Sequence, residues 1–170
     1  RNSGDPVREE ERTAFADRLG VSVSAIHSID ILTEDLHFDR LENTDALLVG
    51  GAGEHSVCRP EPGVRRMIDF LGEATEKGFP TFASCFGFQS LVMALGGPVI
   101  SDEPNAEVGS TWLECTPAAQ GDPIFGELPA RFVAQQGHKD RASALPTQAI
   151  CMAKSDLAPF QAIRIEGKPV

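Results

Sequence analysis

The segment from residue 79 to residue 95 constrains the fold most, because it reads as a strand, a tight turn and a helix in immediate succession. The strand is short and apolar, and small residues then flank Cys85 in the turn. Beyond the turn, apolar side chains recur at helical spacing until Gly96-Gly97 ends the pattern. A buried strand that leads directly into a helix is typical of α/β proteins.

Cys85 occupies the one position in this segment where a reactive side chain would be expected. In a sharp strand-turn-helix connection, small neighbours permit a strained backbone and the central side chain projects above the sheet. The dipole and free amides of the following helix favour a thiolate there. Cys85 is therefore a candidate nucleophile. The alternative is that a single cysteine in an apolar segment serves as a small buried hydrophobe.

The first half of the chain alternates between helical and strand patterns. Asp5-Pro6 is typical of a helix start, and the glutamates at 9–11 are expected to face solvent on that helix. Gly50-Gly51 follows an apolar run and predicts a strand that ends in a glycine turn. Before the strand-turn-helix segment that contains Cys85, the expected elements are a helix to Leu19, a strand over 25–31, a loop with a short helix over 33–44, a strand over 45–49 and a helix over 60–77.

The second half changes character and reads as short strands separated by Pro, Gly and Asp. The predicted strands cover residues 99–100, 108–116, 132–135, 148–153 and 160–165. Together the halves predict a three-layer α/β fold, with a mostly parallel central sheet, helices on both faces and an antiparallel strand extension. Sites in such sheets lie at the carboxyl ends of the strands. Gly51 and Cys85 both follow strands and are expected to face one pocket.

Composition excludes several classes of function. The net charge is −10 with no basic run, so nucleic-acid binding is not expected. The four cysteines lie far apart, without a Cys-x-x-Cys pair or a histidine at ligand spacing, so neither a metal site nor a disulfide scaffold is expected, and a reducing cytosol fits best. No apolar run approaches the ~20 residues of a membrane span. The 170 residues are expected to form one domain.

Several short motifs together resemble class I glutamine amidotransferases, most closely the GMP synthase-like branch. Cys-x-Gly-x-Gln at 85–89 is similar to the family signature Gly-x-Cys-x-Gly-x-Gln, with Ala83 in place of the first glycine. Gly50-Gly51-Ala52 is similar to the family's Gly-Gly-Pro turn. Further along, Glu107-Val108-Gly109 resembles Glu-Tyr-Gly, and Gly137-His138-Lys139-Asp140 resembles Ser-His-Gly-Asp.

The resemblance implies a flavodoxin-like fold and a role for each matching residue. Cys85 would attack the side-chain amide of glutamine, and the amides of Gly51 and Phe86 would hold the oxyanion. Gln89, His138 and Gly137 would line the substrate pocket. His138 has two alternatives, a structural role or service as a substitute base. A γ-glutamyl thioester would form and release ammonia, with no cofactor or metal.

The family's catalytic His and Glu follow a strand that residues 159–164 resemble, and the resemblance implies that both would lie beyond residue 170. Family domains also begin with an apolar strand, whereas Arg1-Asn2-Ser3-Gly4 resembles the loop that follows this strand in the chain. We therefore expect a single amidotransferase-like domain over residues 1–170 that lacks the first strand and the His/Glu strand, and a longer gene product.

Three functions remain open at this point. The first is glutamine hydrolysis, with ammonia passed to a synthetase domain or subunit, since the chain has no ATP pyrophosphatase loop of its own. The second is γ-glutamyl peptidase activity on small γ-glutamyl compounds, for which Lys139 could bind a longer substrate's carboxylate. The third is a catalytically inactive domain that binds a ligand or regulates a partner.

Overall fold

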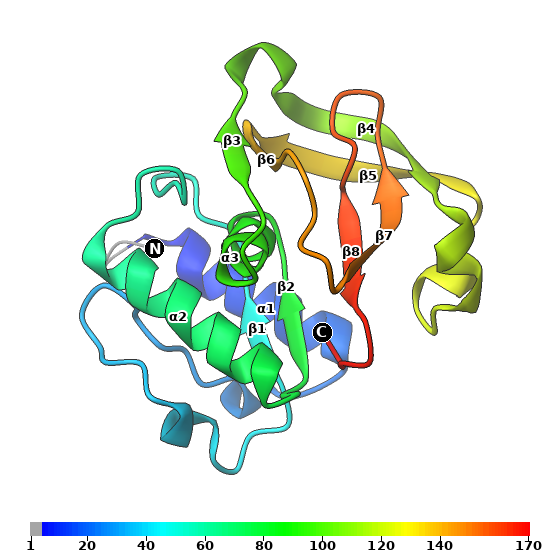
Figure 1. Ribbon diagram of the computed structural model, residues 1–170. Coiled ribbons are helices and arrows are strands. Elements are labelled where there is room, and N and C mark those ends of the chain that lie inside the picture. The colour runs from blue at the N-terminus through cyan, green and yellow to red at the C-terminus, as the bar shows by residue number, and fades with distance from the viewer. Residues whose placement is uncertain (1–4) are drawn as a thin grey trace.

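A computed structural model of the protein describes residues 5–170, and Figure 1 shows its arrangement. Two short strands form a parallel pair at the centre, with helices on both of its sides, and an antiparallel sheet stands beside them. The expectation for residues 1–4 lies outside the described residues. In chain order the helices and strands are α1 Val7–Leu19, β1 Leu47–Val49, α2 Pro62–Glu76, β2 Thr81–Ala83, α3 Phe86–Ala94, β3 Val99–Ser101, β4 Glu107–Cys115, β5 Arg131–His138, β6 Asp140–Ala142, β7 Ala149–Lys154 and β8 Ala162–Ile165.

The main core lies between α2, α3 and the parallel strands. In α2 the apolar side chains recur every three or four residues, so that Val64, Met67 and Leu71 share one face. These residues are almost completely buried and pack with Phe86 of α3 and with side chains of β1. Burial of a leucine such as Leu71 stabilises the fold by about 1.5–3 kcal/mol. The apolar face of α2 therefore holds β1 and α3 in place on either side of the turn that contains Cys85.

Helix α1 covers the other side of the parallel pair, as Figure 1 shows behind β1. Helix α1 begins at Val7, one residue later than predicted, and the carboxylate of Asp5 accepts a hydrogen bond from the Val7 amide at 3.0 Å. At the other end the chain leaves the helix through Gly20 at φ 68°. The ring of Phe15 packs edge-to-face on Phe82 of β2, with centroids 6.3 Å apart.

The second half of the chain forms the predicted antiparallel extension. A four-stranded sheet has the order β5-β4-β7-β8, and β3 pairs with β6 in a separate ribbon. The long pairing of β4 with β5 runs from Glu107 opposite His138 to Glu114 opposite Arg131. This register brings two sequence motifs, around residues 107 and 138, directly opposite each other.

The structure corrects two expectations of the sequence. The predicted strand over 25–31 is wrong, because residues 26–30 form no strand. Val23–Ala25 is instead a short 3₁₀ helix, and the Ser22 hydroxyl caps its start by accepting a hydrogen bond from the Ser24 amide. The strand β6 was missed because Asp140–Ala142 has no apolar alternation, and its pairing with β3 is non-local.

Parallel pairing within the described part of the chain is confined to β1 and β2, so a mostly parallel central sheet is not observed there. Residues 33–44 form the expected loop, with a 3₁₀ helix over Phe38–Leu41. Further 3₁₀ helices span Val23–Ala25, Glu103–Asn105, Pro117–Gly121 and Phe125–Glu127. In residues 5–170 no helix is both long and apolar enough to cross a membrane.

An ion pair ties the connection before β5 to strand β8. Arg164 donates to both carboxylate oxygens of Asp122 at 2.7 and 3.1 Å, and the amides of Ile124 and Phe125 also donate to this carboxylate. The Arg164 hydrogen bond, together with those amides, lowers the pKa of Asp122 from 3.8 to about 2. A carboxylate whose pKa is lower in the folded state stabilises the fold above its unfolded pKa.

We predict that Asp122→Asn lowers the free energy of unfolding by about 1–2 kcal/mol at pH 7, because the ionised carboxylate is lost. The difference from the parent should shrink as the pH falls from about 4 to about 2, where Asp122 itself becomes protonated. Urea denaturation at several pH values measures this, with the exposed Asp156→Asn as the matched control. A difference that stays constant across this pH range would contradict the assignment.

Candidate active site

Cys85 lies at the sharp turn between β2 and α3, as the sequence predicts. Its backbone has φ 51° and ψ −107°, and Asn43 is the one other non-glycine residue with positive φ among the described residues. Such a conformation is strained for an L-residue and is found at functional sites. The side chain is exposed at the N-terminus of α3. The structure therefore places a solvent-accessible thiol where the helix dipole favours negative charge.

Backbone hydrogen bonds lock this turn to the end of β1. The Ser84 amide donates to the Val49 carbonyl at 2.8 Å, and the Gly87 amide donates to the Gly50 carbonyl at 3.2 Å. A Cβ atom on Gly87 would lie 2.4 Å from the Val49 oxygen, so that only glycine permits this close approach. The glycine two residues after Cys85 is thus explained by packing of α3 against β1.

Gly51 and Phe86, the residues predicted to hold the oxyanion, both lie next to Cys85. A Cβ atom built on Gly51 would lie 3.6 Å from the Cβ of Cys85 and 3.8 Å from its sulfur, so Gly51 lies beside the Cys85 side chain. The Phe86 amide makes no hydrogen bond within residues 5–170, and its side chain is buried in the main core. The Cys85 sulfur also lies 3.8 Å from the carbonyl oxygen of Gly137. Gly51, Phe86 and Gly137 therefore surround Cys85.

Gln89 lies one helical turn beyond Cys85 on α3. Its side chain is buried, and its amide nitrogen donates to the Asp140 carbonyl at 2.6 Å. The Asp140 carboxylate in turn accepts a hydrogen bond from the Ser56 hydroxyl, which follows the glycine turn after β1. Gln89 and Asp140 thus connect α3 to β6 and to the loop after β1. The substrate-binding role of Gln89 stays a prediction.

His138 lies opposite Glu107 in the pairing of β4 with β5 and belongs to a cluster of polar side chains that are mostly buried. Its Nε2 lies 3.3 Å from Glu107 and 3.4 Å from the amide nitrogen of Gln161, which itself donates to Glu107 at 2.5 Å and to Ser155 at 3.0 Å. The Glu107 side chain is only 2% exposed and that of His138 is 12% exposed. These contacts hold the His138 ring in place, and its role stays a prediction.

Sequence reasoning missed one residue at this site, Glu11. It was expected to face solvent with Glu9 and Glu10, and these two glutamates are exposed. Glu11 instead accepts a hydrogen bond from the Gly51 amide at 3.1 Å. Its four-residue spacing from Phe15, which faces the sheet, was the signal that could have identified it.

The other thiols differ from Cys85 in their surroundings. Burial raises the pKa of Cys58 and of Cys151, which keeps these thiols protonated near neutral pH. Within residues 5–170, no three His, Cys, Asp or Glu side chains are grouped in a way that could hold a metal ion. Cys85 is therefore the thiol best placed for nucleophilic chemistry.

Because the backbone of Cys85 is strained, we predict that glycine is more stabilising than alanine at this position, the reverse of the order usual in helices and strands. We expect Cys85→Gly to be more stable to unfolding than Cys85→Ala by about 1 kcal/mol, because glycine adopts positive φ without strain. At Cys151 in β7 the order should be reversed, since glycine weakens a strand. Chemical denaturation of the four variants measures both differences. A more stable Cys85→Ala would show that the turn is not strained.

Comparison with known proteins places this geometry in a family. The profile of "Glutamine amidotransferase class-I" matches residues 14–170. Over 128 residues the chain is 33% identical to GMP synthase of Thermosipho melanesiensis, which covers 75% of this chain and 23% of that protein. Over 115 residues it is 30% identical to gamma-glutamyl-L-1-hydroxyisopropylamide hydrolase of a Pseudomonas species, which covers 65% of this chain and 39% of that protein.

Solved structures agree on the fold. A Thermoplasma acidophilum protein, provisionally assigned as one of the subunits of GMP synthase, superposes with a TM-score of 0.77 at 21% identity, over 99% of this chain and 77% of its own. A glutamine amidotransferase of Thermotoga maritima gives 0.74 at 21% identity, over 90% of this chain and 64% of its own. The chain spans less than half the length of the curated relatives named above. By its profile match and its fold, the chain belongs to the class I glutamine amidotransferase family.

Proposed function

We propose that the protein hydrolyses the side-chain amide of glutamine through a Cys85 thioester. The observation that carries this proposal is the position of Cys85, strained and exposed at the N-terminus of α3 beside Gly51 and Phe86. Two backbone donors beside a nucleophile can stabilise a tetrahedral oxyanion, and one such donor contributes about 3 kcal/mol in comparable enzymes. The GMP synthase relatives, described as glutamine-hydrolysing, support the substrate.

The reaction would proceed in two steps. The Cys85 thiolate attacks the amide carbon of glutamine, and the carbonyl oxygen takes up negative charge toward the amides of Gly51 and Phe86. Collapse of this intermediate breaks the C–N bond, and the nitrogen leaves as ammonia after it gains a proton. Water then attacks the γ-glutamyl thioester through a second tetrahedral intermediate and releases glutamate and the free thiolate.

A group that transfers protons is required for both steps, first to protonate the departing nitrogen and then to deprotonate the attacking water, and we infer that it lies on a strand beside β2. The Pro169 carbonyl accepts a hydrogen bond from the Thr81 amide at 2.9 Å, and Val170 is buried in the cluster that contains Leu91 of α3. A parallel strand in this register would bring a residue about four or five positions beyond Val170 level with Cys85. We propose that the catalytic His and Glu occupy that segment of a longer protein, and that an additional first strand completes a mostly parallel sheet.

The pocket assignments follow from this reaction. We propose that Gln89, Gly137 and His138 bind or position the glutamine, with His138 held by Glu107. Ammonia would pass to a synthetase domain or subunit, as the names of the GMP synthase relatives suggest. The chemistry fits a reducing cytosol, where the thiol stays available.

A second candidate is hydrolysis of other γ-glutamyl amides. The Pseudomonas relative, a gamma-glutamyl-L-1-hydroxyisopropylamide hydrolase, supports this candidate because the leaving group of its substrate is larger than ammonia. Both reactions use the same thioester. They differ only in the amine that departs, so the nucleophile and the oxyanion donors would be unchanged.

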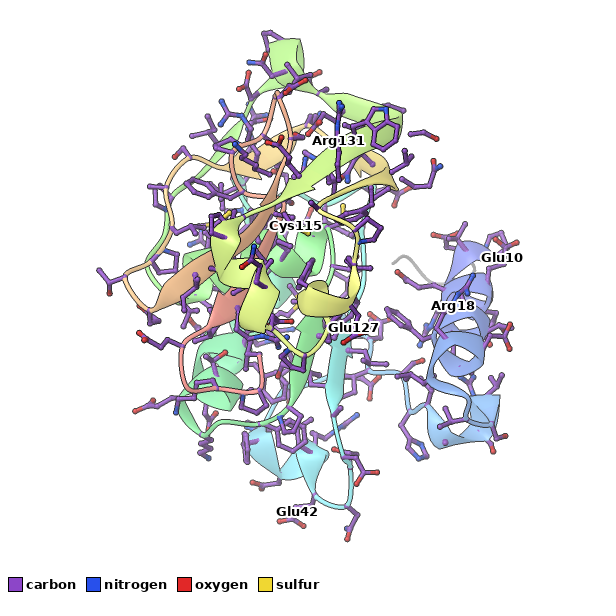
Figure 2. The ribbon with its side chains drawn as sticks, turned by 90° about the vertical axis from the view of Figure 1, so that its right-hand side faces the viewer. Glu10, Arg18, Glu42, Cys115, Glu127 and Arg131 are labelled. Carbon is purple, nitrogen blue, oxygen red and sulfur yellow. The ribbon has the colours of Figure 1, made fainter. Side chains whose placement is uncertain are left out.

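We predict that replacing Cys85 with alanine in the full-length protein lowers glutamine hydrolysis by about a thousand-fold or more, because no thioester can form. Glutamate production measures the loss, with Cys115→Ser on the distant end of β4 as the matched control; Figure 2 labels Cys115 there.

Glutamine and a γ-glutamyl alkylamide should be compared in the same assay. A higher kcat/KM for glutamine supports the first candidate, and a higher value for the alkylamide supports the second. Hydrolysis of neither substrate by the full-length protein would favour a binding or regulatory domain and would refute the enzyme assignment.

A further inference from the structure

Glu11 of α1 occupies the glycine turn that lies against Cys85. One carboxylate oxygen of Glu11 accepts the hydrogen bond of the Gly51 amide at 3.1 Å. The same oxygen would lie 2.1 Å from a Cβ atom built on Gly50, so the carboxylate fills the space that a side chain at residue 50 would need. The contact with both glycines is therefore close and depends on the absence of a side chain at Gly50.

The hydrogen bond from Gly51 to Glu11 conflicts with the proposed role of the Gly51 amide as an oxyanion donor. In the proposed function, the Gly51 amide is one of two donors to the oxyanion, whereas here it donates to a carboxylate. A single N–H cannot serve both oxygens at full strength, and a negative carboxylate beside the site repels the negative oxyanion. Phe86 offers its amide, but Gly51 does not. The site as described therefore has one of its two donors occupied.

We propose that Glu11 is an internal competitor for the oxyanion hole, and that it must leave the Gly51 amide before glutamine hydrolysis reaches full rate. This inference rests on the proposed function. Hydrogen bonds to a charged acceptor are stronger than neutral ones, so the carboxylate holds the amide effectively while α1 keeps its place. Withdrawal of Glu11 frees the amide for the substrate oxygen.

The packing of α1 allows such a withdrawal. Ala16 is the one buried residue in the helix, while Val7 and Leu19 are 38% and 54% exposed. Phe15, one turn beyond Glu11, contacts Phe82 at the surface of the sheet. Figure 2 shows α1 at one side of the molecule. Elements with few buried apolar contacts move at low free-energy cost, so a small shift of α1 suffices to carry Glu11 away from Gly51.

The first test replaces Glu11 in the full-length protein. Glu11→Ala should raise kcat for glutamine hydrolysis about three- to ten-fold, with little change in KM, because the competitor acts against the transition state. Glu11→Gln should give a smaller increase, since an uncharged amide oxygen still accepts the hydrogen bond. Glu10→Ala is the matched control, because it removes the same charge from an exposed position of α1, which Figure 2 labels.

Gly50→Ala provides an independent way to expel Glu11, because the added methyl group takes the space of the carboxylate and Gly50 does not have positive φ. It should also raise kcat in the parent protein. In the Glu11→Ala background it should have no further effect, since nothing remains to be displaced. This double-mutant cycle separates displacement of Glu11 from a general disturbance of the turn.

The plateau rate of Cys85 alkylation by iodoacetamide at alkaline pH, where the thiolate is fully formed in every variant, should be about equal in all of them, because alkylation forms no carbonyl oxyanion. A fall in kcat for Glu11→Ala, with unchanged alkylation and thermal unfolding, would overturn the inference and make Glu11 a supporting residue of the turn. So would additive effects in the cycle. Should the parent protein show no Cys85-dependent hydrolysis at all, the proposed function itself would fail, and the two failures are thereby distinguished.

Discussion

Two backbone hydrogen bonds between the end of β1 and the turn after β2 determine the geometry of the whole site. They join Ser84 to Val49 and Gly87 to Gly50, and they hold the first turn of α3 directly above β1. Because Gly87 carries no side chain, α3 can approach β1 closely enough to make them. The strained backbone of Cys85 follows from this constraint, since the chain must reverse within a few residues.

The same constraint brings the thiol and the glycine turn after β1 together. Gly51 lies against Cys85, and any group that binds the Gly51 amide therefore lies close to the Cys85 thiol. Glu11 does so from α1, a helix with little buried surface. The antiparallel extension completes the other side, where the Gly137 carbonyl faces the Cys85 sulfur and Glu107 holds His138. Cys85 thus lies between a sheet that is tied to it by backbone hydrogen bonds and a helix with one buried residue.

The strand-turn-helix at Cys85, the glycine turn and α2 could all be predicted from the sequence, because each depends on local patterns of small and apolar residues. Gly51 and Phe86 could be placed beside Cys85 for the same reason, since parallel strands end at one edge. Three other contacts between distant segments were not predicted, because no strand end or local pattern marks both of their partners. The pairing of β6 with β3, the hydrogen bond from Gln89 to Asp140 and the reach of Glu11 to Gly51 join segments far apart in the chain.

The measurement that tests the central claim most directly is mass spectrometry of the full-length protein after exposure to an electrophilic glutamine analogue. The account predicts a single adduct on Cys85, formed faster than adducts on Cys58, Cys115 or Cys151, and slowed by excess glutamine, because Cys85 alone among the four cysteines is exposed at the N-terminus of a helix and is the proposed nucleophile. Labelling spread over the other cysteines, or labelling of Cys85 that glutamine does not slow, would contradict the claim that this elbow is a glutamine-hydrolysing site.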